Sequence, residues 1–204
     1  RSVKAVPVLL ELLSRASGGM RRTILNALGK TADGRASEAL LSGLDDADRV
    51  VRSTCANGLV RVLVKGKQEA GDDGNSKAYR SLLEKVLKYC REGDSKDVRL
   101  VLVRGLGRLG DPYAVETLRG MLLPMRRDPA LQAAAATALG ALKARNAVDD
   151  LTEALSDPDP LVQRAALRAL VSIGELRCVP TLIERLATDE VVRRKETVKA
   201  LRAI

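Results

Sequence analysis

Apolar residues recur along the chain with the spacing of one face of an α-helix. In six segments a leucine follows apolar or small residues three and four positions earlier, and in five of them another apolar residue lies eight positions earlier. These offsets place the residues on one side of a helix, which we name the A helix. The defining leucines are Leu28, Leu59, Leu106, Leu139, Leu170 and Leu201.

The spacing of these leucines indicates a repeated unit. Successive leucines are separated by 31, 47, 33, 31 and 31 residues, and a near-constant period of this length is typical of a solenoid. A second apolar pattern, the B helix, alternates with the A helices and is illustrated by Val115, Leu118 and Leu122. The sequence therefore predicts an all-α chain, folded as a right-handed α-solenoid of about six helical hairpins.

The same pattern predicts how the chain is divided. We expect a single repeat domain over 1–204, with units at 18–46, 47–94, 95–128, 129–158 and 159–190 and half units at 1–17 and 191–204. The long second unit contains KGKQEAGDDGNSK, residues 65–77, whose one apolar residue is Ala70. We predict that this segment is a surface loop between an A helix and a B helix.

Turn-forming residues lie where the predicted helices begin and end. Asp111, Asp128 and Asp159 each precede a proline, and an aspartate in that position favours the N-cap of a helix. Glycines also fall near the predicted A-to-B turns, where a chain reversal favours positive φ. These glycines are Gly29, Gly110, Gly140 and Gly174.

Both ends of the chain carry more apolar residues than one helix face buries. The first predicted helix includes Val3, Val8 and Leu12 outside its B-helix pattern, and the last predicted helix includes Val191. The chain also begins with Arg1. We therefore expect a fragment of a longer protein that continues with further repeats or a cap, and otherwise a chain that associates end to end with itself.

The segment 157–174 carries a recognisable phrase, D-P-x-x-x-V-x-x-A-A-L-x-A-L-x-x-I-G. Together with the leucine-rich helix after it, this phrase resembles the HEAT repeat. The short period is similar to the HEAT-like class of phycobilisome lyases and bacterial scaffold proteins. The resemblance implies stacked helical hairpins whose B helices line a concave surface that binds a protein partner. As a second alternative it implies a phycobilin-lyase-like enzyme or a chaperone.

Composition narrows the chemistry. The chain has 35 basic and 26 acidic residues and a net charge of +9, which permits anionic partners without selecting one. It contains no histidine, and Cys55, Cys90 and Cys178 form no Cys-x-x-Cys motif. We therefore expect no metal, no cofactor and no enzymatic activity, and a reducing compartment such as the cytoplasm. Apolar runs are too short for a membrane span.

Two sets of residues are candidates for partner binding. A protein partner on the B-helix face would meet residues that lie near the central leucine of each B pattern. These are Arg80, Glu84, Glu116, Arg119, Asp149, Glu153 and Glu184. Because the A helices hold most of the positive charge, the alternative is a nucleic acid or another anionic surface on the A-helix face.

The anion-binding alternative rests on a column of basic residues in the A helices. Seven positions before the defining leucine the chain has arginine in four helices and glutamine in two. The basic residues considered are Arg21, Arg22, Arg52, Arg99, Arg164, Arg194 and Lys195. The HEAT resemblance implies a structural role instead, in which this column pairs with aspartates in neighbouring units. Those aspartates are Asp48, Asp94, Asp128, Asp159 and Asp189.

Overall fold

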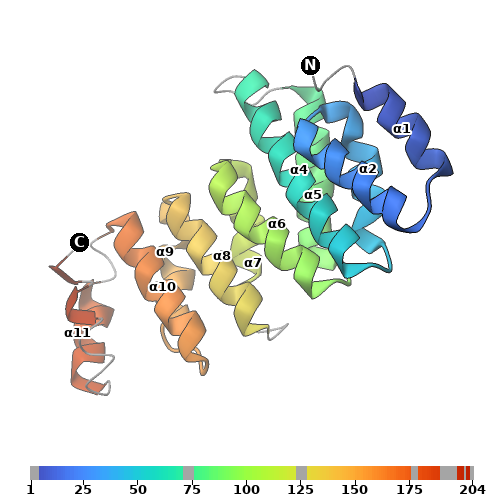
Figure 1. Cartoon of the computed structure of the whole chain (residues 1–204). Helices are drawn as coiled ribbons and strands as arrows, with labels where there is room; N and C mark the ends of the chain where they lie inside the picture. The colour runs from blue at the N-terminus through green and yellow to red at the C-terminus, as the bar shows by residue number, and fades with distance from the viewer. Residues whose placement is uncertain are drawn as a thin grey trace. The chain divides into compact units, whose positions relative to one another are not determined.

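The computed structural model describes residues 5–70, 76–122, 128–175, 179–188, 197–199 and 201–202. These residues form helices and turns and contain no β-strand, so the all-α prediction is confirmed (Figure 1). The helices are α1 (Val6–Arg15), α2 (Gly18–Thr31), α3 (Ser37–Ser42), α4 (Arg49–Ala70), α5 (Lys77–Glu92), α6 (Lys96–Leu109), α7 (Val115–Gly120), α8 (Pro129–Ala141), α9 (Val148–Ala154), α10 (Pro160–Ile173) and α11 (Val179–Thr188). Short 3-10 turns are η2 (Gly34–Ala36), η3 (Gly43–Asp45), η4 (Pro112–Ala114) and η5 (Arg145–Ala147).

The chain divides into two compact units, Arg1–Gly105 and Leu106–Ile204, here named unit 1 and unit 2. The division falls inside α6 and not at the end of a repeat. That position is physically reasonable in a solenoid, because each repeat contacts only its neighbours and no central core marks a boundary.

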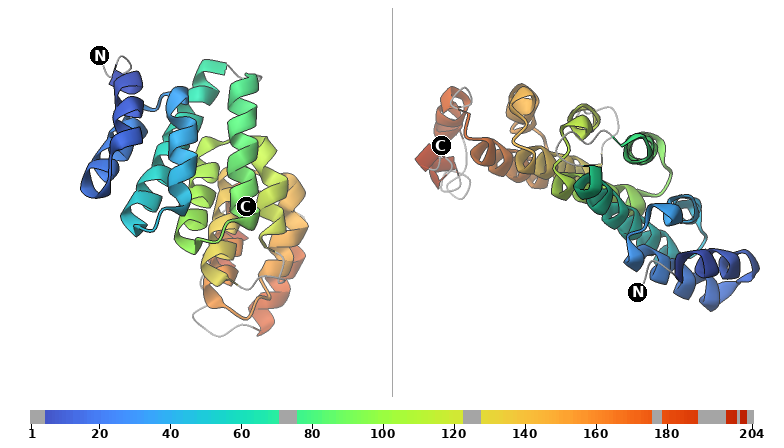
Figure 2. Two further views of the ribbon diagram at one scale, coloured as in Figure 1. Left: turned by 90° about the vertical axis from the view of Figure 1, so that its right-hand side faces the viewer. Right: turned by 90° about the horizontal axis from the view of Figure 1, so that it is seen from above.

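Each unit is built from A helices and B helices in two layers. In unit 1 the A helices α2 and α4 lie side by side and form one layer. The B helices α3 and α5 pack on α4 and form the second layer (Figure 2). The defining leucines Leu28 and Leu59 are fully buried between the layers, together with Leu40 and Leu83 of the B helices. In unit 2 the A helices α8 and α10 pack against each other, and α9 packs on α10. The predicted A and B patterns therefore mark the buried sides of these helices.

Neighbouring A helices approach each other at residues with almost no side chain. In unit 1 a Cβ atom added to Gly58 would lie 2.8 Å from the Cα atom of Gly29 and 3.2 Å from Leu40. In unit 2 a Cβ atom added to Gly140 would lie 2.7 Å from the Cα atom of Ala169. Glycine is required at these positions because the backbones nearly touch.

This close approach corrects the interpretation of Gly29 and Gly140 as turn residues, since both lie inside A helices. Gly110 and Gly174 do end their helices with positive φ, at 68° and 72°. The equivalent positions after α2 and α8, four residues beyond the defining leucine, are Ala32 (φ 51°) and Lys143 (φ 52°). A left-handed residue therefore ends these helices whether or not it is glycine.

The aspartate caps form where the sequence predicts them. The side chains of Asp128 and Asp159 accept hydrogen bonds from the backbone N–H groups of Leu131 (3.3 Å) and Leu161 (2.8 Å) at the starts of α8 and α10. Asp111 caps the 3-10 turn η4 by accepting from Tyr113 N–H at 2.9 Å. These bonds satisfy amide groups that the first helical turn leaves unpaired.

The predicted loop 65–77 is wrong in its first half, because α4 continues to Ala70. This helix has 22 residues against 14 in α2, so it extends about 12 Å further at 1.5 Å per residue. An i,i+4 ion pair between Lys65 and Glu69 (3.4 Å) supports the extension. Residues 71–75 of the predicted loop lie outside the described residues, as do Val3 and Val191 of the predicted end helices.

The glycine contact between α2 and α4 generates a prediction. We expect Gly58→Ala to lower the free energy of unfolding by about 1–3 kcal/mol, because the new methyl group must displace backbone atoms of α2. Gly19→Ala is the matched control, since a Cβ atom there meets nothing within 4 Å and alanine favours the helix by up to about 1 kcal/mol. Urea unfolding followed by circular dichroism compares the variants; equal stabilities would contradict the close approach.

Candidate functional site

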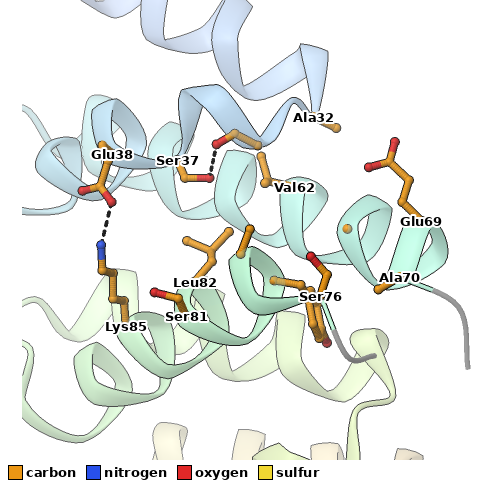
Figure 3. A pocket seen from close by; sticks show the side chains of 14 residues that line it. Ala32, Ser37, Glu38, Val62, Glu69, Ala70, Ser76, Ser81, Leu82 and Lys85 are labelled. Carbon is orange, nitrogen blue, oxygen red and sulfur yellow. Dashed lines mark hydrogen bonds and ion pairs between the residues drawn. The ribbon is translucent and has the colours of Figure 1, made fainter. Parts of the chain in front are cut away.

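A pocket of about 390 Å³ lies in unit 1, between the turn after α2, the extended end of α4 and the start of α5 (Figure 3). Its floor is apolar and consists of Val62, Tyr79 and Leu82, which are at most 7% exposed. Its rim is polar and carries hydroxyl and charged side chains. The polar rim residues are Ser37, Glu38, Glu69, Ser76, Ser81 and Lys85.

The pocket exists because the second hairpin is longer than the first. The residues that α4 contributes, Val62, Gly66, Glu69 and Ala70, all lie beyond its defining leucine. A Cβ atom added to Gly66 would lie 3.4 Å from the ring of Tyr79, so the extended ends of α4 and α5 are in contact. The opposite wall comes from the shorter first hairpin, which leaves the space above it open.

The wall formed by the turn after α2 is held by Asp33. Its carboxylate accepts hydrogen bonds from the backbone N–H of Arg35 (2.9 Å) and from the Arg35 guanidinium (3.0 and 2.8 Å). The hydrogen bond from the Arg35 side chain is the main reason why the pKa of Asp33 is lowered to about 2. Ala32 and Gly34, which flank this aspartate, therefore line the pocket in a fixed turn.

The B-helix candidates of unit 1 do not line this pocket. Arg80 and Glu84 lie about 100° around α5 from Ser81 and Lys85, which do line the pocket. Lys85 instead joins the B helices, with an ion pair of 2.6 Å to Glu38 of α3. The structure thus brings together Glu38 and Lys85 and leaves Glu84 exposed.

In unit 2 the B-helix candidates are partly used to join neighbouring hairpins. Arg119 of α7 forms ion pairs with Glu116 (3.1 Å) and with Asp150 of α9, and the hydrogen bond that it donates to Asp150 is the main cause of its raised pKa. Asp149 and Glu153 of α9 are exposed. The side chain of Glu184 lies outside the described residues.

Arginines of the basic column in the A helices donate hydrogen bonds to backbone carbonyl oxygens of the same chain. Arg52 donates from Nη1 to the carbonyl oxygens of Asp46 (2.8 Å) and Ala47 (3.0 Å), and Arg99 donates from Nε to Cys90 O (2.8 Å). All three acceptors lie in or just before the turn that leads into the arginine's own helix. These arginines therefore hold the inter-repeat turns.

The glutamines of the same column do the same without a charge. Gln132 donates from Nε2 to Leu122 O (3.2 Å), and Gln163 donates to Asp157 O (2.6 Å). The implied aspartate–arginine ladder is therefore corrected in detail. Arg52, Arg99, Gln132 and Gln163 donate to backbone carbonyl oxygens, and the predicted aspartates Asp128 and Asp159 cap their own helices. Arg21 does form an ion pair with an aspartate, but its partner is Asp46 (3.1 Å), which was not among the predicted aspartates.

The anion-binding set is thus divided. Arg22 and Arg164 are exposed, whereas Arg194 and Lys195 lie outside the described residues. Other exposed cations of the A helices were not among the predicted residues; they include Lys30, Arg61 and Arg104. Their signal was an offset of two residues from a buried leucine, which turns a side chain about 200° away from the core.

The described residues offer little reactive chemistry. Burial is the main cause that raises the pKa of Cys55 and of Cys90 to about 12. Cys178 lies outside the described residues. Within the described ranges no cluster of three or more cysteine, aspartate or glutamate side chains is placed to hold a metal ion. None of the helices described is both long and apolar enough to cross a membrane.

Stacked helical hairpins with this register define an α-solenoid repeat protein of the armadillo and HEAT type. A family model for HEAT repeats matches residues 1–60, 83–141 and 122–202. The chain therefore belongs to the HEAT-repeat family. No curated protein is similar enough in sequence to match it.

Solved structures with the same fold have diverse roles. A designed armadillo repeat protein in complex with the peptide (KR)4 has a TM-score of 0.59 and 16% identity over 97% of this chain and 98% of that one. The complex of CpcE and CpcF of phycocyanin lyase from Nostoc sp. has a TM-score of 0.56 and 23% identity over 95% and 74%. Human deoxyhypusine hydroxylase has a TM-score of 0.51 and 18% identity over 98% and 84%. At these identities the likeness shows the fold alone.

Two arginines of the A helices provide a test of the structural column. We expect Arg52→Ala to lower the free energy of unfolding by about 1.5–3 kcal/mol, because it removes charged hydrogen bonds to two turn carbonyls. Arg22→Ala, the same substitution at an exposed position, should change it by less than about 0.5 kcal/mol. Chemical unfolding measures both, and similar losses in the two variants would contradict a special role of Arg52.

The buried thiols lead to a second prediction. At pH 8 only about one in ten thousand of the Cys55 and Cys90 side chains is ionised when the pKa is near 12. We expect neither to react with iodoacetamide in the folded protein during a time that fully labels free glutathione, and both to react in urea. Peptide mass mapping gives the result; rapid labelling of either thiol in the folded chain would show an activated cysteine.

Proposed function

We propose that this chain is a non-catalytic scaffold that binds a protein partner through the B-helix side of its repeats. The observation that carries the proposal is the exposed negative charge of α9 in unit 2. This helix has three carboxylates and no cation, and Asp149 and Glu153 are exposed, while its apolar side is fully used in packing. Exposed charge over a packed interior is suited to recognition and not to reaction.

The polar groups elsewhere favour binding over catalysis. Asp33, Arg52 and Arg119 are engaged in turn or inter-hairpin contacts, and both described cysteines are buried with raised pKa values. The sequence has no histidine for acid–base work. Phycocyanin lyase and deoxyhypusine hydroxylase share the fold, but at 23% and 18% identity the likeness carries neither activity over to this chain.

The charge of α9 supports a basic segment as the bound part of the partner. A structural neighbour, the designed armadillo repeat protein, was solved with the basic peptide (KR)4. In the present chain a lysine or arginine of the partner would gain from Asp149 and Glu153, whereas Asp150 is already paired with Arg119. We infer that the contact is charge-assisted and that salt weakens it.

The pocket of unit 1 supports a second docking point for the same partner. Its volume of about 390 Å³ suits one or two side chains, and its apolar floor of Val62, Tyr79 and Leu82 suits an aliphatic one. The pair Glu38–Lys85 at the rim supplies a donor and an acceptor for the adjacent backbone. Binding at two places would add affinity without any catalytic group.

The proposal is tested by charge reversal on the two sides of unit 2. The partner is first captured with the intact chain and purified, and its affinity is then measured by calorimetry. We expect Asp149→Lys with Glu153→Lys to weaken binding at least tenfold, because two attractive contacts become repulsive.

The matched control is Arg164→Glu with Arg168→Glu, which changes as much charge on α10 of the same unit. It should leave the affinity within about twofold. If the α10 variant lost binding while the α9 variant kept it, the partner would lie on the A-helix side. Equal losses in the two variants would remove the support for either side.

A further inference from the structure

The positive charge of the chain is concentrated on the A helices of unit 1. The net charges of α2, α4 and the unit 1 part of α6 are +3, +4 and +2, a total of +9 that equals the net charge of the whole chain. In contrast, α8 of unit 2 is an A helix without any charged residue. The charge is therefore a property of one region and not of A helices in general.

Most of these basic side chains form ion pairs or hydrogen bonds within the fold, and a few do not. Arg21, Arg49 and Lys65 form ion pairs, and Arg52 and Arg99 bind turn carbonyls. Four exposed cations have neither an ion pair nor a hydrogen bond within the described residues. They are Arg22, Lys30, Arg61 and Arg104.

All four point away from the core. Arg22 lies two residues before the buried Ile24, and Lys30 lies two residues after Leu28. Arg61 and Arg104 likewise follow Leu59 and Leu102 by two residues. A displacement of two residues is about 200° around a helix, so each of these side chains projects from the side of its helix opposite to the buried residue.

Three of the four form a row across adjacent helices. Lys30 follows Gly29, which touches Gly58 of α4. Arg61 follows Val60, and Val60 meets Gly105, the residue after Arg104. Each cation is thus next to a contact between helices, so the helix axes beneath the row are about 8–10 Å apart. We name Lys30, Arg61 and Arg104 the basic row.

The surroundings of the basic row determine what it would bind. The exposed amides of Asn26 and Asn57 lie beside it and are also donors. The two carboxylates of these helices, Glu69 and Asp97, are paired with Lys65 and Arg49. The chain has no Phe or Trp and its three tyrosines lie outside α2, α4 and α6, so these helices offer no aromatic side chain for stacking on bases.

We propose that the basic row binds the phosphate backbone of a nucleic acid, without reading its sequence. Cations spread over three helices fit a polyanion with regularly spaced charges better than one small anion. This inference does not depend on the proposed protein partner, because none of Lys30, Arg61 and Arg104 belongs to α9 or lines the pocket of unit 1. Arg22 lies on the same side of α2 and adds a fourth phosphate contact.

The test uses the full chain and a labelled mixed-sequence DNA duplex of about 30 base pairs, followed by fluorescence anisotropy. Four phosphate contacts predict that affinity falls on the order of 100-fold between 50 and 200 mM NaCl. The triple variant Lys30→Gln, Arg61→Gln, Arg104→Gln should bind at least tenfold more weakly at 50 mM and lose most of this salt dependence.

The control is Arg15→Gln, Lys77→Gln, Lys88→Gln, which removes the same charge at exposed positions of α1 and α5. It should bind the duplex within about threefold of the parent chain. Circular dichroism and urea unfolding establish that both triple variants are folded. Equal weakening by the two triples, or no duplex binding at 50 mM, would overturn the proposal. So would binding of polyglutamate or of phosphatidylserine vesicles through the row in the absence of duplex binding.

Discussion

The near contact of A-helix backbones is the constraint on which the rest of each unit depends. Gly29 against Gly58, and Gly140 against Ala169, leave no room for a side chain between neighbouring A helices. At these two contacts the large residues are confined to the layer between A and B helices, where Leu28, Leu59 and their equivalents are buried. Because the stacking distance is set by backbone contact, charged residues of the A helices remain only at the turns or on the outer side.

The turns solve the second physical problem of a helical stack, which is the fate of unpaired backbone groups at helix ends. Amide groups at helix starts are bound by Asp128 and Asp159, and carbonyl groups before the next A helix are bound by Arg52, Arg99 or Gln132. Arginine and glutamine are interchangeable here because both present an N–H donor at the same reach. Their common task is to donate a hydrogen bond to a turn carbonyl, and the arginines do so with a charged donor.

The repeat was predictable from the sequence because burial has a strict period, and the defining leucines marked every A helix that the structure describes. The end of α4 was not predictable in the same way. Lys65 to Ala70 has almost no apolar residue, and its helix is held by the Lys65–Glu69 pair and by Gly66 against Tyr79. The latter contact depends on α5, so the pocket between them has no signature in the local sequence.

Position relative to the buried leucine decides the role of each arginine. Seven residues before it, the guanidinium of Arg52 donates a hydrogen bond to a carbonyl oxygen in the turn that precedes its own helix. Two residues after it, Arg61 points outward and has no partner within the described residues. On a B helix, Arg119 bridges to the next hairpin. A net charge of +9 is thus the sum of structural and unassigned charges, and only the unassigned ones bear on a partner. Lys30, Arg61 and Arg104 are unassigned charges on adjacent A helices of unit 1, and this placement makes them a candidate binding surface.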